Sequence, residues 1–123
     1  MNKNNKIVLI IDDNKFILKP LALLLSGLGY EVRTSLNGRD SAILQKPFAD
    51  LFLLDMRLQN AKGQDGPDVC VKIKHNKKIK KIPVIMFSAD SQGGGMARKV
   101  GADDFIAKPF SMTNLVKKIE QYI

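Results

Sequence analysis

Three runs of consecutive apolar residues stand out along the chain, and each ends abruptly at a polar residue. The runs are Ile7–Ile11, Leu51–Leu54 and Val84–Phe87. A strand that is buried on both faces has this pattern, because no polar residues alternate with the apolar ones. Tyr30–Ser35 and Phe105–Ala107 also have strand-like composition. The pattern therefore predicts five strands in a parallel sheet that is covered by helices on both faces.

Apolar residues between these runs recur every three or four positions, which predicts helices. The first helix follows a cap at Asp13 or Asn14 and stops at Gly29. Pro20 lies inside it and removes one backbone hydrogen bond, so we expect a bend there. The predicted buried face of this helix comprises Phe16, Ile17, Leu21, Leu24, Leu25 and Leu28.

Four further helices are predicted downstream. A short one runs through Ala42–Leu44, and after a loop at Arg57–Gln64 a third opens at Asp65–Pro67. The fourth contains Gly93–Gly95 and should be short or frayed, because glycine disfavours helix by about 1 kcal/mol relative to alanine. Ser111 caps the last helix. The predicted inner positions of the third and last helices are Val69, Cys70, Ile73, Met112, Leu115, Val116, Ile119 and Ile123.

Five strands that alternate with five helices through short connections predict a doubly wound α/β domain. The chain has 123 residues, so we expect residues 1–123 to form a single domain. Hydrophobic residues make up 45% of it, which is enough for one core. Its apolar runs are too short for a membrane helix or a signal peptide, and the single cysteine, Cys70, forms no internal disulfide. We therefore expect a cytoplasmic protein.

The formal net charge is +8, and most of the excess is local. Six lysines and no acidic residue lie between positions 72 and 81, namely Lys72, Lys74, Lys77, Lys78, Lys80 and Lys81. One interpretation is a solvated helix end, because cations are favoured near a helix C-terminus. The other is a patch for an acidic partner or nucleic acid. No aromatic residue is interleaved, which argues against direct DNA binding.

The polar residues that follow the predicted strands suggest a site. In a parallel sheet the carboxyl ends of the strands meet at one edge, so Asp12, Asp13, Asp55, Ser88 and Lys108 should converge there. Three neighbouring carboxylates repel one another unless a cation such as Mg²⁺ binds them. A lysine and a hydroxyl suit phosphoryl oxygens, and a carboxylate can be the nucleophile that accepts a phosphoryl group. Asp55, which stands alone at its strand end, is the candidate nucleophile.

Several stretches, in order and at characteristic separations, resemble the receiver domain of response regulators in bacterial two-component signalling. They are Ile7–Asn14, Asn37–Gly38, Asp50–Asp55, Phe87–Ala89 and Gly101–Phe110. The resemblance extends from Lys6 to Ile123 and implies a flavodoxin-like receiver fold with strand order 2-1-3-4-5. It also implies a signalling switch that accepts a phosphoryl group on Asp55 from a sensor histidine kinase or a phosphotransfer protein. Self-phosphorylation and self-dephosphorylation would both depend on Mg²⁺.

The resemblance assigns a role to each candidate site residue. Asp13 and Asp55 would bind Mg²⁺ together with the backbone carbonyl of Arg57, and Asp12 would reach the ion through water.

Other roles concern the phosphoryl group and the response to it. Ser88 and Lys108 would bind phosphoryl oxygens, and Lys108–Pro109 matches a peptide bond that is cis in the family. Ser88 and Phe105 would form the switch, with the aromatic ring turning inward when the hydroxyl moves toward the phosphate. The output protein is not specified, and a phosphorylation-dependent dimer is one expectation.

The chain also departs from the family pattern. The segment Asp55–Gly66 lacks the usual proline and is about three residues longer, whereas Ser88–Gly101 is about two residues shorter. Two alternatives within the family are a receiver fragment of a larger DNA-binding regulator and one of a hybrid histidine kinase. Alternatives of other classes are a flavodoxin-like cofactor-binding protein and a basic flavodoxin-like nucleic-acid-binding module.

Overall fold

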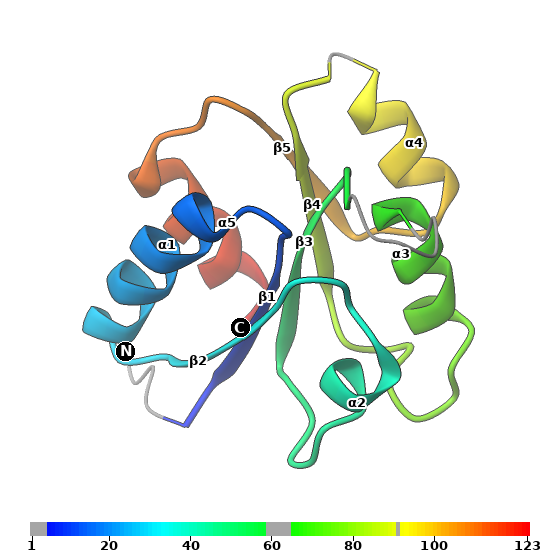
Figure 1. The fold of residues 1–123 in the computed structure, drawn as a ribbon, viewed down its shortest axis with the longest axis horizontal. Helices are drawn as coiled ribbons and strands as arrows, with labels where there is room; N and C mark the ends of the chain where they lie inside the picture. The colour runs from blue at the N-terminus through cyan, green and yellow to red at the C-terminus, as the bar shows by residue number, and fades with distance from the viewer. Residues whose placement is uncertain (1–4, 59–64, 91) are drawn as a thin grey trace.

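A parallel sheet of five strands lies at the centre of the molecule, in the order β2-β1-β3-β4-β5 (Figure 1). The computed structural model describes residues 5–58, 65–90 and 92–123. The strands are β1 (Ile7–Ile11), β2 (Glu31–Ser35), β3 (Leu51–Asp55), β4 (Val84–Ser88) and β5 (Asp104–Ala107). The predicted strands and their order are confirmed. Residues 59–64 of the predicted loop lie outside the described residues.

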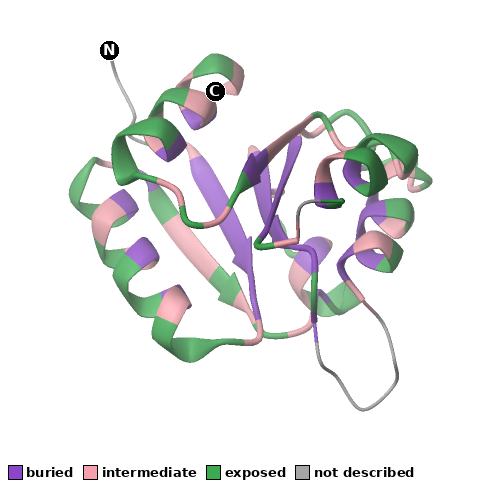
Figure 2. Ribbon diagram, turned by 90° about the horizontal axis from the view of Figure 1, so that it is seen from above, coloured by how far each residue is buried: buried purple, intermediate pink, exposed green. Residues whose placement is uncertain are grey.

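Five helices flank the sheet in two layers. They are α1 (Lys15–Gly27), α2 (Asp40–Ile43), α3 (Gly66–Lys74), α4 (Gly93–Lys99) and α5 (Met112–Tyr122). Helices α1 and α5 cover one face of the sheet, and α2, α3 and α4 cover the other (Figures 1 and 2). This arrangement confirms the doubly wound α/β fold. None of the helices in the described part of the chain has the length and apolar character needed to cross a membrane.

Each face of the sheet has its own hydrophobic core, since successive residues of a strand point to opposite faces. In β1, Leu9 and Ile11 pack toward α2, α3 and α4, whereas Val8 and Ile10 pack toward α1 and α5. All four side chains are buried, as are all residues of β3 and β4 (Figure 2). The uninterrupted apolar runs of the sequence follow from this double burial.

Side-chain caps fix where the helices begin. The Asn14 side chain accepts a hydrogen bond of 2.9 Å from the Phe16 N–H at the start of α1. Asp65 and Asp68 form a capping box at α3, and Ser111 caps α5. Of the two caps predicted for α1, Asp13 or Asn14, the structure has Asn14, and the cap predicted at Ser111 is confirmed. The predicted start of the third helix at Asp65–Pro67 is confirmed as well, with Asp65 as its cap.

Some positions predicted to be inward are exposed instead. They are Phe16, Leu28 and Met112. The buried stripe of α1 is formed by Leu18, Leu21 and Leu25. Phe16 precedes Leu18 by two residues, which is about 200° around a helix, so it points away from the sheet and is 90% exposed. Helix α1 runs through Pro20 without interruption.

The three glycines Gly93–Gly95 affect both the length of α4 and the packing of the Phe105 ring. Helix α4 has only seven residues, as the sequence predicts, but it is formed and all three glycines lie in its first turn. A Cβ at Gly93 would lie 2.9 Å from the Phe105 ring and 3.1 Å from the Ser88 Cβ, whereas a Cβ at Gly95 would meet nothing within 4 Å. Only the first of these glycines is required by close packing.

This difference between two neighbouring glycines predicts opposite effects of the same substitution. Gly95→Ala should raise the free energy of unfolding by about 0.5–1 kcal/mol, because alanine favours helix and meets no neighbour. Gly93→Ala should lower it, since the new methyl group displaces the Phe105 ring. Chemical denaturation measures both. A stabilising Gly93→Ala would show that the ring does not pack against α4 in solution.

Candidate functional site

The predicted site residues converge at the carboxyl edge of the sheet. Asp55 and Ser88 are the last residues of β3 and β4, Asp12 and Asp13 follow β1, and Lys108 follows β5. The register places Asp55 opposite Phe87 and Ser88 opposite Ala107, which brings the strand ends level with one another. The sheet therefore gathers groups that lie far apart in the sequence.

Three carboxylates form the acidic part of the site. One oxygen from each of Asp12, Asp13 and Asp55 lies within 4.8 Å of the others. Asp12 is 0% exposed; its Oδ1 accepts a hydrogen bond of 2.9 Å from the Asn14 N–H, and its Oδ2 has no hydrogen-bond partner among the described residues. A buried carboxylate oxygen without a hydrogen bond is costly, so this oxygen favours a bound cation or water.

One ammonium group faces these carboxylates. The Lys108 Nζ lies 3.4 Å from Asp55 Oδ1 and 3.9 Å from Asp12 Oδ2. It also lies 4.7 Å from the centroid of the Phe87 ring, which favours a cation over its face. The ring was not singled out in the sequence, although it immediately precedes Ser88. Among the described residues, Lys108 is the basic side chain in ion-pair contact with Asp12 and Asp55.

Burial makes negative charge unfavourable here. The carboxyl of Asp55 is only 7% exposed, and burial together with the nearby Asp12 raises its pKa to about 6, although Lys108 opposes the shift. Burial also raises the pKa of Asp12. Both groups would be relieved by a divalent cation, because such an ion compensates the charge that solvent no longer screens.

The donor set fits a hard cation. Carboxylate oxygens are the ligands that Mg²⁺ prefers, and it commonly binds through one or two carboxylates with water in the other positions. Asp12, Asp13 and Asp55 supply such oxygens within a small volume, and the unsatisfied Oδ2 of Asp12 lies among them. The predicted contribution of the Arg57 carbonyl stays a prediction.

Ser88 is buried at the end of β4 and is held by the segment that follows it. Its Oγ accepts a hydrogen bond of 2.9 Å from the Asp90 N–H. The Asp90 carboxylate accepts from the Gln92 N–H at 2.9 Å and from the Arg57 guanidinium at 3.3 Å, and these contacts lower the pKa of Asp90. Asp90 thus connects the residues after β3 with those after β4. Its position two residues after a serine is typical of a local turn, but nothing in the sequence indicates the contact with Arg57.

The predicted switch residue, Phe105, lies against the start of α4, as Ser88 does. It pairs with Met86 across β4 and β5, and its half-buried ring packs against Gly93 and Gly94. The switch pair is therefore brought together through α4, because Gly93 is close to both side chains.

Comparison with known proteins identifies the family. A family model described as the response regulator receiver domain matches residues 8–120. The chain belongs to this family. Receiver domains act in two-component signalling, and the match covers every residue of the site described above. It does not favour the flavodoxin-like cofactor-binding or nucleic-acid-binding alternatives.

Curated relatives and solved structures agree with this assignment. The receiver is 32% identical to the transcriptional regulatory protein GltR of Pseudomonas aeruginosa over 98% of this chain and 50% of that protein. It is 35% identical to the sensory transduction protein RegX3 of Mycolicibacterium smegmatis over 91% of this chain and 48% of that protein. It therefore spans about half the length of these bacterial relatives.

Among solved structures, a putative response regulator from Chloroflexus aurantiacus superposes on the receiver with a TM-score of 0.85 at 30% identity, covering 95% of this chain and 96% of that one. The receiver domain of NtrX from Brucella abortus gives a TM-score of 0.82 at 33% identity, covering 94% and 96%.

The raised pKa of Asp55 predicts a pH-dependent effect of removing its charge. Between 3.8 and about 6 the folded protein holds this proton while the unfolded chain has lost it, so the contribution of the group to stability falls as pH rises through that range. Without Mg²⁺, Asp55→Asn should raise the free energy of unfolding at pH 7 by about 1–3 kcal/mol. The gain should shrink as pH approaches 4. Urea denaturation across this range measures it, and a gain independent of pH would exclude charge as its cause.

Proposed function

We propose that this receiver is a phosphorylation-dependent switch whose phosphoacceptor is Asp55. The supporting observation is the position of this carboxylate at the end of a central strand, beside the pair Asp12 and Asp13 and 3.4 Å from the Lys108 ammonium. The donor is a phosphohistidine on a sensor histidine kinase or a phosphotransfer protein. We propose that residues 1–123 act as one receiver unit and that transfer takes place in the cytoplasm.

The proposed transfer is a nucleophilic displacement at phosphorus. A carboxylate oxygen of Asp55 attacks the phosphoryl group, an O–P bond forms, the N–P bond of the donor breaks, and the released imidazole takes a proton from solvent. Lys108 and the Ser88 hydroxyl bind the phosphoryl oxygens and stabilise their negative charge during the transfer. Mg²⁺, when bound, would neutralise charge on the phosphoryl oxygens; Asp13, Asp55 and the Arg57 carbonyl would hold it, with Asp12 acting through water.

Reversal uses water as the nucleophile. Attack of water on phosphorus breaks the O–P bond, regenerates the Asp55 carboxylate and releases inorganic phosphate. The groups that stabilise the forward transfer also stabilise this step, so the domain catalyses its own dephosphorylation.

The response to phosphorylation begins at Ser88. In the unmodified protein the Ser88 hydroxyl accepts a hydrogen bond of 2.9 Å from the Asp90 N–H. When the hydroxyl donates to a phosphoryl oxygen instead, the Ser88 side chain moves toward Asp55 and away from Asp90. Phe105 follows, because its ring and Ser88 share the space beside Gly93. The moving surface is then α4 and β5, through which we propose that the output partner or a second phosphorylated copy is contacted.

Helix α1 offers a surface on which the phosphodonor protein can dock. Its outward side carries Phe16 and Leu23, which are strongly exposed, with Pro20 between them. These residues follow one another at helical spacing beside the site, and exposed apolar residues of this kind mark protein contacts. We propose that the kinase or phosphotransfer protein docks there.

Because the matched relatives include transcriptional regulators about twice as long, we also propose a DNA-binding output region as the partner within a longer protein.

Phosphorylation is tested with a small donor that needs no kinase. In the presence of Mg²⁺ and acetyl phosphate, the intact mass should rise by one phosphoryl group. Asp55→Asn should abolish the increase, whereas Glu31→Gln, at an exposed acid of β2, should leave it unchanged. An aspartyl phosphate on Asp55→Asn, located by peptide mapping, would exclude Asp55 as the acceptor.

Metal binding is tested at Asp13. Asp13→Ala should weaken Mg²⁺ binding by at least about tenfold, because it removes a direct oxygen ligand. Isothermal titration calorimetry measures the affinity, with Glu31→Gln as the matched control. Unchanged affinity in Asp13→Ala would place the ion elsewhere.

A further inference from the structure

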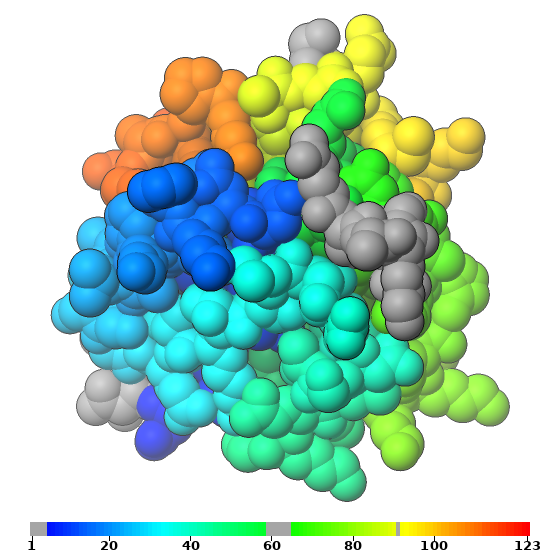
Figure 3. All heavy atoms as spheres, viewed as in Figure 1, coloured from blue at the N-terminus to red at the C-terminus, as the bar shows by residue number. Residues whose placement is uncertain are grey.

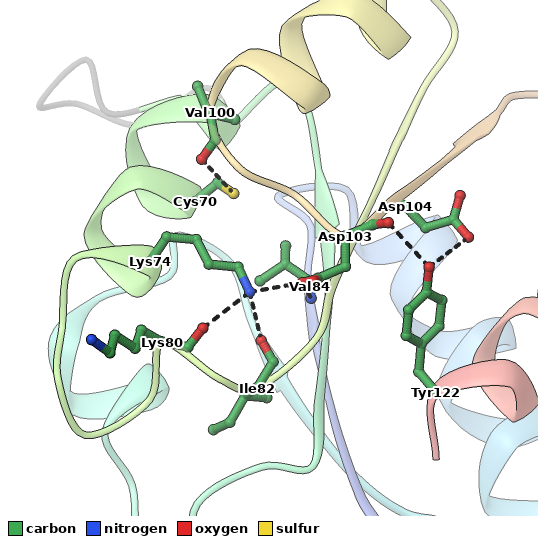
Figure 4. Close-up of polar contacts among 9 residues, drawn as sticks. All are labelled: Cys70, Lys74, Lys80, Ile82, Val84, Val100, Asp103, Asp104 and Tyr122. Atoms are coloured by element: carbon green, nitrogen blue, oxygen red, sulfur yellow. Dashed lines mark hydrogen bonds and ion pairs between the residues drawn. The ribbon is translucent and has the colours of Figure 1, made fainter.

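The six lysines between positions 72 and 81 do not form one group in the structure. Lys72 pairs with Asp40 of α2 at 3.1 Å, and the Lys74 ammonium lies 2.7 Å from Asp103. Lys74 also donates to the backbone carbonyls of Lys80 and Ile82 at 3.2 and 2.9 Å (Figure 4). These two lysines therefore serve the fold, and their charges are largely compensated.

The other four lysines lie beyond the last turn of α3 and point into solvent. They are Lys77, Lys78, Lys80 and Lys81. The Lys80 side chain extends away from the Lys74 cluster in Figure 4. Stabilisation of the helix end accounts for Lys72 and Lys74 but not for these residues, because the effect falls off within the last turn.

The backbone that carries these lysines is firmly held. Ile79 is buried, and the Asn76 carbonyl accepts hydrogen bonds from the N–H groups of Ile79 and Lys80 at 3.1 and 2.9 Å. The Asn76 side chain accepts another from the Lys78 N–H at 2.9 Å. Together with the Lys74 ammonium, these contacts fix the segment, so a partner would not have to order its backbone on binding.

A second basic segment lies at the end of α4, which packs against α3. The Cys70 thiol of α3 donates to the Val100 carbonyl at 3.6 Å, which places the end of α4 against α3. Arg98 and Lys99, in the last turn of α4, are both exposed. The segment after α3 and the residues of α4 project along the same side of the molecule in Figure 3. We call these six residues the basic surface: Lys77, Lys78, Lys80, Lys81, Arg98 and Lys99.

Charge on the basic surface is uncompensated. None of its six residues forms an ion pair within the part of the chain that the structure describes. Asp103, which follows α4, is occupied by Lys74 and by the Val84 N–H at 2.8 Å.

Helices α3 and α4 each carry an exposed apolar side chain. Val71 is 39% exposed and Met96 is 42% exposed. Met96 and Pro67 line one hollow together with Arg57, Asp65 and Asp90, so Met96 lies toward the phosphoacceptor site. Val71 lies one turn beyond Pro67 toward the lysines. An acidic polypeptide could use these side chains, whereas a nucleic-acid backbone would gain little from them.

We propose that the outer side of α3 and α4 binds an acidic polypeptide segment that also carries apolar side chains. Its carboxylates contact the basic surface, and its apolar residues pack against Val71 and Met96. The lysines of this surface are separate from the phosphoacceptor site, since they follow the C-terminal end of α3 and the site lies at the carboxyl edge of the sheet, whereas Met96 lies nearer to the site. The charges accelerate association, and the apolar contacts slow dissociation.

The proposal is tested with the whole chain and a fluorescein-labelled peptide in which Glu and Asp alternate with Leu and Phe at helical spacing. Fluorescence anisotropy should show saturable binding that weakens with salt. Lys78→Glu and Lys81→Glu should each weaken binding about three- to tenfold. Met96→Ser should also weaken it, whereas Lys117→Glu, at an exposed lysine of α5, should not.

Two competing probes complete the experiment. The same peptide with Ser in place of Leu and Phe should bind more weakly, and duplex DNA should bind more weakly than the apolar-acidic peptide. Phosphorylation of every variant by acetyl phosphate verifies that it is folded and keeps this test independent of the phosphoacceptor. An equal loss in Lys117→Glu, equal binding of the Ser peptide, or tighter binding of DNA would each overturn the proposal.

Discussion

The burial of two carboxylates beside the Lys108 ammonium is the constraint on which the functional end of this molecule depends. Asp12 is completely buried and Asp55 nearly so, while Lys108 is the basic side chain described in contact with both. Charges that solvent cannot screen interact strongly, so the site is unstable in isolation but sensitive to added charge. A cation or a phosphoryl group therefore changes its energy more than either would change that of an exposed acidic cluster.

The fold supplies this constraint through its strands and one helix cap. Because β1, β3 and β4 are parallel neighbours, their final residues reach the same edge, and burial on both faces of the sheet removes solvent from around them. Asn14 then serves two functions: its side chain caps α1, and its N–H holds one oxygen of Asp12. The start of a helix and the orientation of a site carboxylate thus depend on one residue.

The sequence predicts what depends on order along the chain and misses what depends on tertiary neighbours. The apolar runs locate Asp55 and Ser88 at strand ends because strand direction alone determines that edge. Phe16 is misplaced because a small error in helical phase turns a residue from core to solvent. The role of Gly93 depends on Phe105, a neighbour across α4 and β5, and the contact of Asp90 with Arg57 joins two loops. Local patterns carry no information about such contacts.

The two ends of α4 are both tied to other elements, which limits how a signal can pass through it. At its start, Gly93 fits between Ser88 and the Phe105 ring. At its end, the Val100 carbonyl accepts from Cys70, and Asp103 holds Lys74. The sequence alone predicts that three glycines leave this helix short or frayed, yet the helix is formed from Gly93 to Lys99. A displacement of Ser88 would therefore shift α4 as a short rigid body against α3, because its packing at both ends opposes unwinding.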